Sequence, residues 1–234
     1  MEIIRLDKYL SITCKMTKQE IQECLKQGKV QIDNEIIYDK KMKISLQQKV
    51  KVNNQEITRP VFIYYMLNKP KGVVSALKDL NETTILDLMD VPYKEELRIM
   101  GRLDKDTTGL VILTNDLRLI KHHTLPQYQV QKIYEVVLKE PITSKMIEQF
   151  KKGVVIDQNV VCKEATLIKL NEYTAQVILT EGKYHQIKKM FLSVGNQVVE
   201  LKRIAMNQLK LDDRLSLGKY RELNEQEITL LKKA

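Results

Sequence analysis

Residues 101–116 have the sequence Gly-Arg-Leu-Asp-Lys-Asp-Thr-Thr-Gly-Leu-Val-Ile-Leu-Thr-Asn-Asp. The part up to residue 109 is mostly polar and contains Asp104 and Asp106, and residues 110–113 are all apolar. Acidic residues and glycine next to an apolar run are typical of a loop that leads into a buried strand. We therefore predict that Asp104 lies on a loop at the start of such a strand.

This loop has three interpretations from its residues alone. Asp104, Asp106, Thr108 and Gly109 match positions 1, 3, 5 and 6 of a calcium-binding EF-hand loop, but Asn115 stands where a bidentate Glu is needed, and the flanks are strand-like. The Asp-Thr-Thr-Gly run is also found in aspartic proteases, but that chemistry needs a second copy, and the chain has no internal repeat. The third interpretation, a polar turn whose carboxylates cap backbone amides, stays open at this point.

On both sides of this loop, short apolar segments predict strands, and amphipathic segments predict helices. The predicted strands are residues 62–67, 110–113, 133–138, 165–170 and 175–179, and the predicted helices are residues 85–89, 145–152 and 186–194. Because the strands do not alternate strictly with the helices, we predict an α+β fold. Pro60 restricts Arg59 to extended geometry, so we expect a linker at 58–60 between two domains, 1–59 and 60–234.

The smaller domain is predicted to contain two helices followed by short strands. Residues 6, 9, 10 and 13 have the spacing of one helix face, and Thr17 with Glu20 has the pattern of a capping box that starts a second helix, which Gly28 ends. Residues 30–36 and 50–57 each have a strand-turn-strand pattern. Residues 1–59 hold 12 basic and 8 acidic residues, a higher positive density than the rest of the chain.

The composition favours an anionic partner. The 234 residues include 39 Lys and Arg against 30 Asp and Glu, a net charge of +9, which suits nucleic acid or an acidic membrane surface. No apolar run approaches the roughly 20 residues of a membrane-spanning helix, and the start lacks a signal-peptide pattern. Cys14, Cys24 and Cys162 and the three histidines do not have metal-ligand spacing. We therefore expect a soluble, cytoplasmic protein without a metal ion, and we take a monomer as the default.

Several motifs together are similar to those of pseudouridine synthases of the RsuA type, a resemblance that covers nearly the whole chain. The string Gly-Arg-Leu-Asp-x-x-Thr-x-Gly-Leu with Leu-Thr-Asn-Asp resembles their catalytic motif. The other matching motifs, in the expected order, are residues 67–72, 132–134, 181–190 and 217–223. Residues 5–10, the helix from Thr17 and residues 28–34 resemble an S4 domain, a small RNA-binding module. The implied fold is an S4-like domain at 1–59 and a catalytic domain with a mixed or antiparallel sheet at 60–234.

The resemblance implies isomerisation of a uridine to pseudouridine in small-subunit (16S) ribosomal RNA, without a cofactor. Asp104 would act at the sugar as nucleophile or base, because breaking a glycosidic bond develops positive charge there. Lys188 matches the basic residue, often Arg, that keeps this carboxylate ionised, and Tyr134 matches the tyrosine that stacks on the target base. The same motifs leave open a large-subunit RNA substrate, a non-catalytic S4-type assembly factor and an RNA-directed glycosidase.

The expected partner is ribosomal RNA or a ribosomal assembly intermediate. A uridine in folded RNA must be flipped out of its stack to be reached, and basic side chains then hold the phosphates. Arg102, next to the catalytic loop's Asp104, is expected to hold the flipped nucleotide or fill the vacated stack. The other expected RNA contacts are Arg5, Lys8, Lys18, Lys69, Lys71, Lys183, Lys189 and Arg203.

Overall fold

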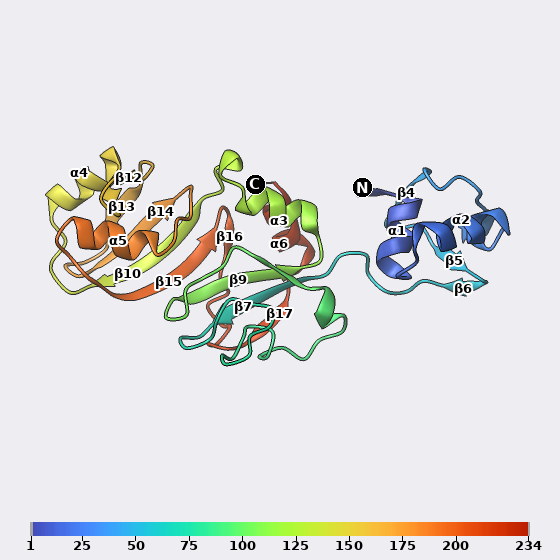
Figure 1. Cartoon of the computed structure of the whole chain (residues 1–234), viewed down its shortest axis with the longest axis horizontal. Helices are drawn as coiled ribbons and strands as arrows, with labels where there is room; N and C mark the ends of the chain where they lie inside the picture. Colours follow the sequence, from blue (N-terminus) through green and yellow to red (C-terminus); the bar gives the residue numbers. More distant parts are fainter. Residues whose placement is uncertain (1, 234) are drawn as a thin grey trace. The chain divides into compact units, whose positions relative to one another are not determined.

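The computed structural model describes residues 2–233, and the chain divides into two compact units, residues 1–62 and residues 63–234 (Figure 1). The division follows directly after the linker predicted at residues 58–60. Each unit has its own apolar core, formed by separate sets of buried side chains. Within residues 2–233, no helix has the length and apolar character needed to cross a membrane.

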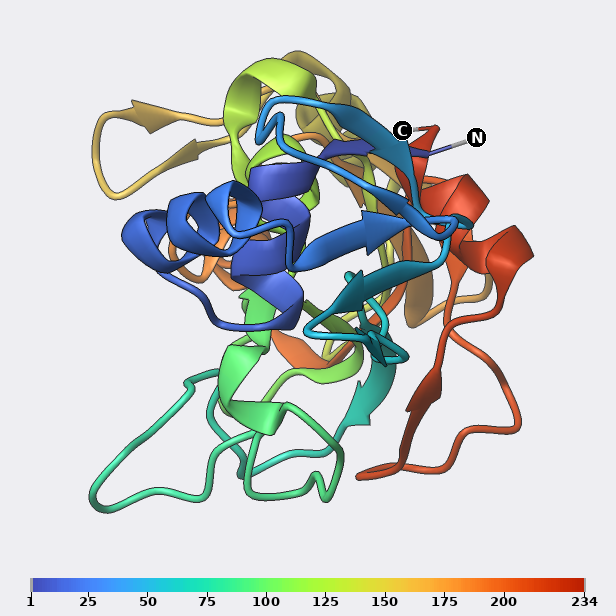
Figure 2. The same ribbon diagram turned by 90° about the vertical axis from the view of Figure 1, so that its right-hand side faces the viewer.

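Unit 1 contains two helices and short strands (Figure 2). Its elements are β1 (Ile3–Arg5), α1 (Leu6–Thr13), α2 (Lys18–Lys26), β2 (Val30–Ile32), β3 (Glu35–Ile36), β4 (Lys43–Ser45), β5 (Val50–Val52) and β6 (Gln55–Glu56). The predicted capping box is present, because Thr17 and Glu20 each accept a hydrogen bond from the other's backbone N–H. The turns β2–β3 and β5–β6 are made by Asp33-Asn34 and by Asn53-Asn54, all with positive φ. Such pairs match the twist of a two-residue hairpin.

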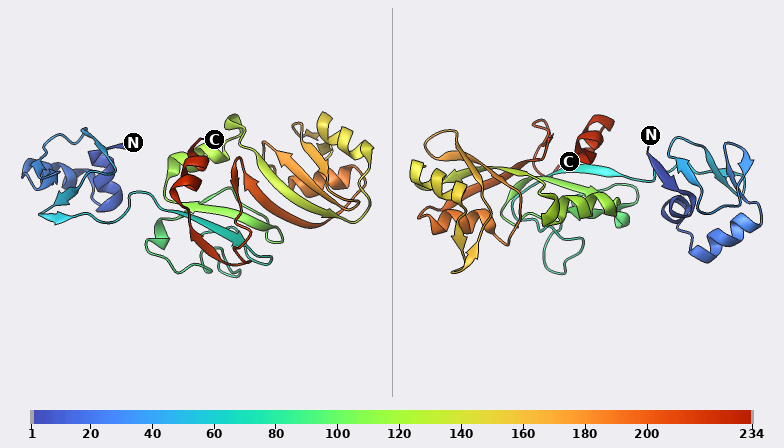
Figure 3. Two further views of the ribbon diagram at one scale, coloured as in Figure 1. Left: turned by 180° about the vertical axis from the view of Figure 1, so that it is seen from behind. Right: turned by 90° about the horizontal axis from the view of Figure 1, so that it is seen from above.

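Unit 2 is built on one large mixed sheet (Figure 3). Its strands are β7 (Tyr64–Lys69), β8 (Arg98–Met100), β9 (Thr108–Thr114), β10 (Lys132–Leu138), β13 (Thr166–Lys169), β14 (Thr174–Leu179), β15 (Val198–Met206), β16 (Leu209–Lys210) and β17 (Tyr220–Glu222). The order across the sheet is β13-β14-β10-β15-β9-β7-β17, with β8 paired to β9 and β16 to β15. The α+β prediction with a mixed sheet is confirmed.

Two antiparallel halves of this sheet meet in one short parallel pair, β15 with β9. At this junction Gly109 lies opposite Arg203 on one side and Lys69 on the other, and Arg203 lies opposite Tyr134. These residues form a row across β10, β15, β9 and β7. Side chains in such a row point to the same face of a sheet, so the row brings distant segments together on one face.

The glycine in this row allows the two halves to join. Gly109 has a φ of +105°, and a Cβ placed on it would lie 2.3 Å from the backbone oxygen of Arg203. Any side chain at this position would therefore push β15 away from β9. The glycine at position 109 is therefore required by the pairing of the two strands.

Helices and short hairpins complete unit 2. These elements are η1 (Lys94–Glu96), α3 (Leu117–Thr124), η2 (Pro126–Tyr128), α4 (Ser144–Lys152), β11 (Val155–Ile156), β12 (Val160–Val161), α5 (Gln186–Ser193) and α6 (Glu225–Lys232). The predicted helices at 145–152 and 186–194 are confirmed as α4 and α5, which contact each other through Phe150 and Phe191, with ring centroids 4.7 Å apart. The predicted helix at 85–89 is wrong. That segment forms hydrogen-bonded turns, because five residues are too few to sustain a helix without other support.

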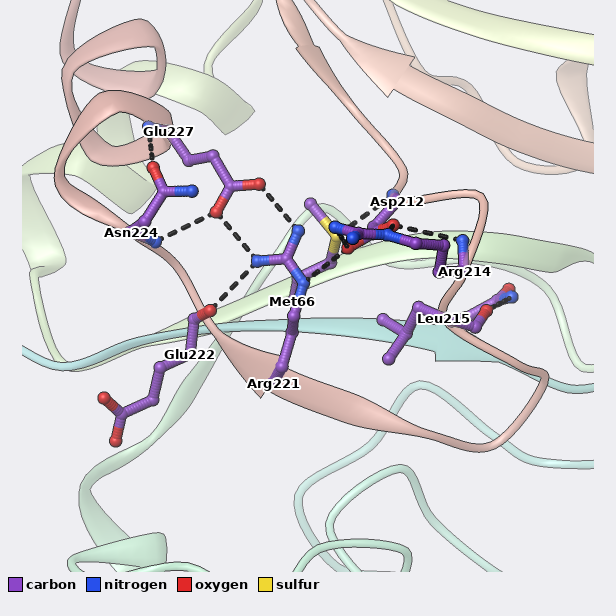
Figure 4. Close-up of polar contacts among 9 residues, drawn as sticks. Met66, Asp212, Arg214, Leu215, Arg221, Glu222, Asn224 and Glu227 are labelled. Carbon is purple, nitrogen blue, oxygen red and sulfur yellow. Dashed lines mark hydrogen bonds and ion pairs between the residues drawn. The ribbon is translucent and has the colours of Figure 1, made fainter.

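An ion-pair network connects helix α6 to the sheet (Figure 4). Arg221 on β17 donates two hydrogen bonds to the Glu227 carboxylate on α6, at 2.8 and 2.7 Å, and a third to Asp212, at 2.9 Å. Asp212 also accepts from Arg214 and lies in the segment after β16. The guanidinium of Arg221 thus connects α6, the edge strand β17 and the segment between β16 and β17.

Candidate active site

A cavity of about 560 Å³ opens at the junction of the two half-sheets. It is lined by the loop before β9, by β10 and β15, by α3 and by the segment before α5. The lining residues that could take part in chemistry or recognition are Arg102, Asp104, Thr107, Lys132, Tyr134, Glu181, Lys183, His185, Gln186 and Arg203. The site is therefore assembled from segments far apart in the sequence.

The loop that carries Asp104 is held by hydrogen bonds on several sides. The Ser75 hydroxyl donates to the Leu103 carbonyl at 2.7 Å and accepts from the Leu103 N–H at 3.0 Å. The Gly72 N–H donates to the Lys105 carbonyl at 2.9 Å, and the Thr107 N–H to the Asp104 carbonyl at 3.1 Å. A loop fixed in this way presents its carboxylate in one position, which is a requirement for a catalytic group.

Two of the expected phosphate contacts, Lys69 and Arg203, are buried beneath this loop. Lys69 is 0% exposed and donates to the carbonyls of Pro70, Lys105 and Thr107. Arg203 is 1% exposed and donates to the carbonyls of Leu110 and Gly101, both at 2.8 Å. The three donors of Lys69 are all used inside the protein, so the expectation that it contacts a phosphate is corrected. Arg203 is not a surface residue as expected, but its side chain lines the cavity from within. Both donate hydrogen bonds to carbonyls of the loop that carries Asp104.

The buried position of Lys69 also affects its titration. Burial away from water lowers the pKa of Lys69 to about 8, although Asp106 and Asp104 nearby favour its charged form. A cation at this place contributes positive potential beneath the loop that holds both carboxylates.

Asp104 is part of a cluster of charged side chains. Its carboxylate lies 3.4 Å from Lys188 Nζ and 3.7 Å from His185 Nε2, and its side chain is 28% exposed. The predicted pairing of Asp104 with Lys188 is thus present in the geometry. Lys188 lies still closer to Asp106, at 2.5 Å from Oδ1. The hydrogen bond and charge of Lys188 lower the pKa of Asp106 despite the opposing effect of burial.

No role was predicted from the sequence for Asp106 or His185, although both lie within the matching motifs. Asp106 contacts Lys188, and two residues so far apart in the sequence give no local sign of their contact. His185 has a φ of 53°, and this left-handed turn immediately before α5 brings its ring to Asp104. Residues other than glycine uncommonly adopt a left-handed backbone, although His does so more often than most. The contact of His185 with Asp104 depends on this conformation, which the sequence alone does not reveal.

Tyr134 and Lys132 enter the cavity from β10. Tyr134 is buried and lines the cavity together with Asp104, as the resemblance implies. Lys132 was not predicted as a site residue, and it donates one hydrogen bond, to the Val130 carbonyl at 3.2 Å. Burial, and next the charge of Arg203, lower the pKa of Lys132 to about 8. An amine in this position is placed to donate to a polar group of a ligand in the cavity.

The other predicted RNA contacts lie at the surface. Arg102 is exposed at the mouth of the cavity. Lys71 is exposed and lies 3.7 Å from Glu200, whereas Lys183 is ion-paired with the buried Glu181. The contacts expected in unit 1, which are all exposed, are Arg5, Lys8 and Lys18. Among residues 2–233 no cluster of three or more His, Cys, Asp and Glu side chains is arranged to hold a metal ion.

Comparison with known proteins identifies the family of this chain. The family of RNA pseudouridylate synthases matches residues 63–193, which include the Asp104 loop, Tyr134 and Lys188. The chain belongs to this RNA pseudouridylate synthase family.

Relatives match over almost the full length. The chain is 41% identical to a protein of Bacillus subtilis (strain 168) named as an uncharacterized RNA pseudouridine synthase, YtzG, over 97% of this chain and 98% of that protein. It is 35% identical to the ribosomal small subunit pseudouridine synthase A of Yersinia pestis, over 96% and 97%. A solved pseudouridylate synthase structure has 33% identity and a TM-score of 0.70, and covers 97% of this chain and 99% of its own.

Proposed function

We propose that this pseudouridine synthase isomerises a uridine of small-subunit (16S) ribosomal RNA. The observation that carries the proposal is the position of Asp104 at the wall of a cavity that Tyr134 also lines, with Lys188 3.4 Å from its carboxylate. Full-length relatives named as ribosomal small subunit enzymes support the choice of RNA. The net charge of +9 suits a polyanionic substrate.

In the proposed reaction the bond from N1 of uracil to C1′ of the ribose breaks, the base turns, and C5 bonds to C1′. No atom is lost: the hydrogen on C5 leaves as a proton, and N1 gains one. Asp104 either attacks the sugar or removes a proton from C2′, and a single carboxylate suffices because no water has to be activated. We propose that Lys188 acts as the partner cation of this carboxylate, while Asp106 and His185 hold the lysine and the carboxylate in place.

The uridine enters the cavity after it has been flipped out of its stack. We propose that the ring of Tyr134 packs against the uracil, and that Arg102 at the cavity mouth holds the nucleotide or takes its place in the stack. A cavity of about 560 Å³ offers space for one nucleotide unit. Unit 1, with exposed basic residues on and around α1 and α2, is proposed to be an S4-like domain that binds RNA around the target.

The test uses purified protein with transcripts of small-subunit and large-subunit ribosomal RNA, followed by chemical mapping of pseudouridine. We expect pseudouridine at one position in the small-subunit transcript, or in an assembly intermediate that contains it. Modification of the large-subunit RNA alone would contradict the proposed substrate. Release of free uracil would indicate a glycosidase, and RNA binding without any modification would indicate an assembly factor.

A further inference from the structure

An aromatic ring stands exposed at the rim of the active-site cavity. Tyr184 is 74% exposed, and among the described residues its hydroxyl has no hydrogen-bond partner. The next residue, His185, lines the cavity and lies 3.7 Å from Asp104. A large aromatic side chain in this position gains little for the stability of the fold, because most of its surface stays in water.

Tyr184 is nevertheless held in one orientation by its neighbours. Its ring stacks on the ring of His185, with centroids 3.8 Å apart and an angle of 18° between the planes. The ammonium group of Lys189 lies 5.2 Å from the Tyr184 centroid and is itself fixed by Asp157 at 2.5 Å. Because Tyr184 as a whole residue is still 74% exposed, these contacts cover only part of it.

The segment that carries Tyr184 is also braced internally. The side chain of Gln186 donates to the buried Glu181 carboxylate at 2.6 Å and accepts from the Lys183 N–H at 2.9 Å. Glu181 is ion-paired with Lys183 and accepts from the Lys163 N–H at 2.9 Å. Tyr184 is therefore presented by a rigid turn, and a rigid aromatic group loses little entropy when it binds a ligand.

These features fit a nucleobase better than an apolar protein surface. Lys183 and Lys189 lie in the same short segment as Tyr184, and although each is ion-paired, with Glu181 and with Asp157, they add positive charge beside the ring, which suits a phosphate backbone better than an apolar surface. Flipping one uridine into the cavity unstacks its neighbours in the strand, and these need a new stacking partner close to the cavity mouth. Aromatic side chains at such places stack on bases of any sequence.

We propose that Tyr184, backed by His185, is a stacking platform for an unpaired RNA base directly next to the target nucleotide. The inference rests on the proposed function, because it needs a flipped nucleotide in the cavity. It adds a second nucleotide-binding position outside the cavity and defines Tyr184 as a residue for substrate binding. By holding the neighbouring base, Tyr184 would position the RNA strand so that the target uridine lies at Asp104.

The test compares Tyr184→Ala with Tyr184→Phe in the full-length protein, on any RNA that the wild-type protein modifies. A second substrate carries an abasic nucleotide on one or the other side of the target uridine. Tyr173→Ala is the matched control, because Tyr173 is also exposed, at 43%, but does not line the cavity. The measured quantities are kcat and KM for pseudouridine formation.

We expect Tyr184→Ala to raise KM about tenfold with a much smaller change in kcat, as is typical of the loss of one stacked base. Tyr184→Phe should restore most of the lost affinity, since the ring is kept. One abasic substrate should show a similar rise in KM with wild-type protein and no further rise with Tyr184→Ala, because both changes remove the same contact.

An unchanged KM for Tyr184→Ala would overturn the platform while leaving the proposed function intact. The same holds if the increases in KM caused by the variant and by the abasic nucleotide multiply when the two are combined. A KM increase of equal size in Tyr173→Ala would overturn it too. Wild-type protein that forms no pseudouridine in any RNA would instead refute the proposed function, and the platform with it.

Discussion

Lys188 lies between two carboxylates, Asp104 at 3.4 Å and Asp106 at 2.5 Å. The ammonium group of a lysine is a single compact charge, so Asp104 and Asp106 compete for it, and a closer contact with Asp106 weakens the contact with Asp104. We infer that Asp106 is a positioning residue, which keeps the ammonium group of Lys188 beside Asp104. Because a lysine cannot form a bidentate ion pair, the Asp104 carboxylate is not held rigidly by it. The proposed reaction needs Asp104 both charged and free to act.

The first prediction concerns this cation. Lys188→Gln removes the cation closest to both carboxylates, so the single-turnover rate of pseudouridine formation should fall by about 10²–10³-fold. Lys188→Arg, which restores the charge, should lose less than about tenfold. Asp106→Asn is the matched variant and should slow the reaction far less than Lys188→Gln. A wild-type rate for Lys188→Gln would show that the ion pair has no part in catalysis.

At this scale the sequence predicted some roles and missed others. Asp104, Tyr134 and Lys188 were singled out because they stand in specific motifs. Asp104 and Tyr134 line one cavity, and Lys188 lies 3.4 Å from Asp104. Lys69 and Arg203 were expected at the surface because charged side chains are almost always exposed. Their burial follows from the row of residues across β10, β15, β9 and β7, which local patterns do not reveal.

Among the elements, the parallel pair β9–β15 decides where the candidate active site lies. It joins the half-sheet that carries Tyr134 to the half-sheet that follows the Asp104 loop. Sequence patterns predicted β9 and β10 as strands, but pairing between β9 and β15 depends on partners far apart in the chain. Register of this kind is set by the packing of the whole sheet rather than by local propensity.

The second prediction tests this junction. Gly109→Ala should place a Cβ against the backbone of Arg203, so we expect a loss of more than about 3 kcal/mol in the free energy of unfolding, together with loss of activity. Gly195→Ala is the control, since Gly195 also has a positive φ, of +80°, but open space around the added Cβ. Its cost should be about 1 kcal/mol. Equal losses in urea unfolding would show that the close approach of the strands is unimportant.

The third prediction concerns the network of Arg221 at the end of the chain (Figure 4). Hydrogen bonds from Arg221 lower the pKa of Glu227, and those from Arg214, followed by Arg221, lower the pKa of Asp212 to about 2. A carboxylate with a lowered pKa in the folded state stabilises the fold above its unfolded pKa. That contribution is lost as the pH falls through the folded pKa.

Arg221→Met should therefore lower stability most near neutral pH. The difference from the wild-type protein, measured by urea unfolding, should decrease as the pH falls below the usual Glu value of 4.5 and continue to decrease toward pH about 2. Asp79→Asn, which lies outside the network, serves as the control variant. A difference that stays constant from about pH 6 to about pH 3 would contradict the proposed contribution of these ion pairs.

In the whole molecule, two units with separate cores allow binding and chemistry to be divided between them. The sequence indicated this division through Pro60 and through the change from a helix-and-hairpin pattern to longer apolar strands. We propose that unit 1 contributes mainly phosphate contacts, and that unit 2 contains all groups that act on the uridine.

The fourth prediction follows from this division. Deletion of residues 1–62 should weaken RNA binding and make its dependence on salt shallower, because fewer phosphates are neutralised. At saturating RNA, the single-turnover rate should stay within about threefold of the full-length protein. Affinities would be measured between about 50 and 200 mM salt. An unchanged affinity and salt dependence would refute the role given to unit 1.

The central claim is that the Asp104 carboxylate performs the chemistry, and it is tested by one substitution. Asp104→Asn has nearly the same shape and leaves Asp106 to hold Lys188. Pseudouridine formation and RNA affinity would be measured with the same RNA and the full-length protein. We expect no detectable pseudouridine, with an affinity within about threefold of the wild-type value. Formation of pseudouridine by Asp104→Asn at the wild-type rate would contradict the mechanism proposed for this protein.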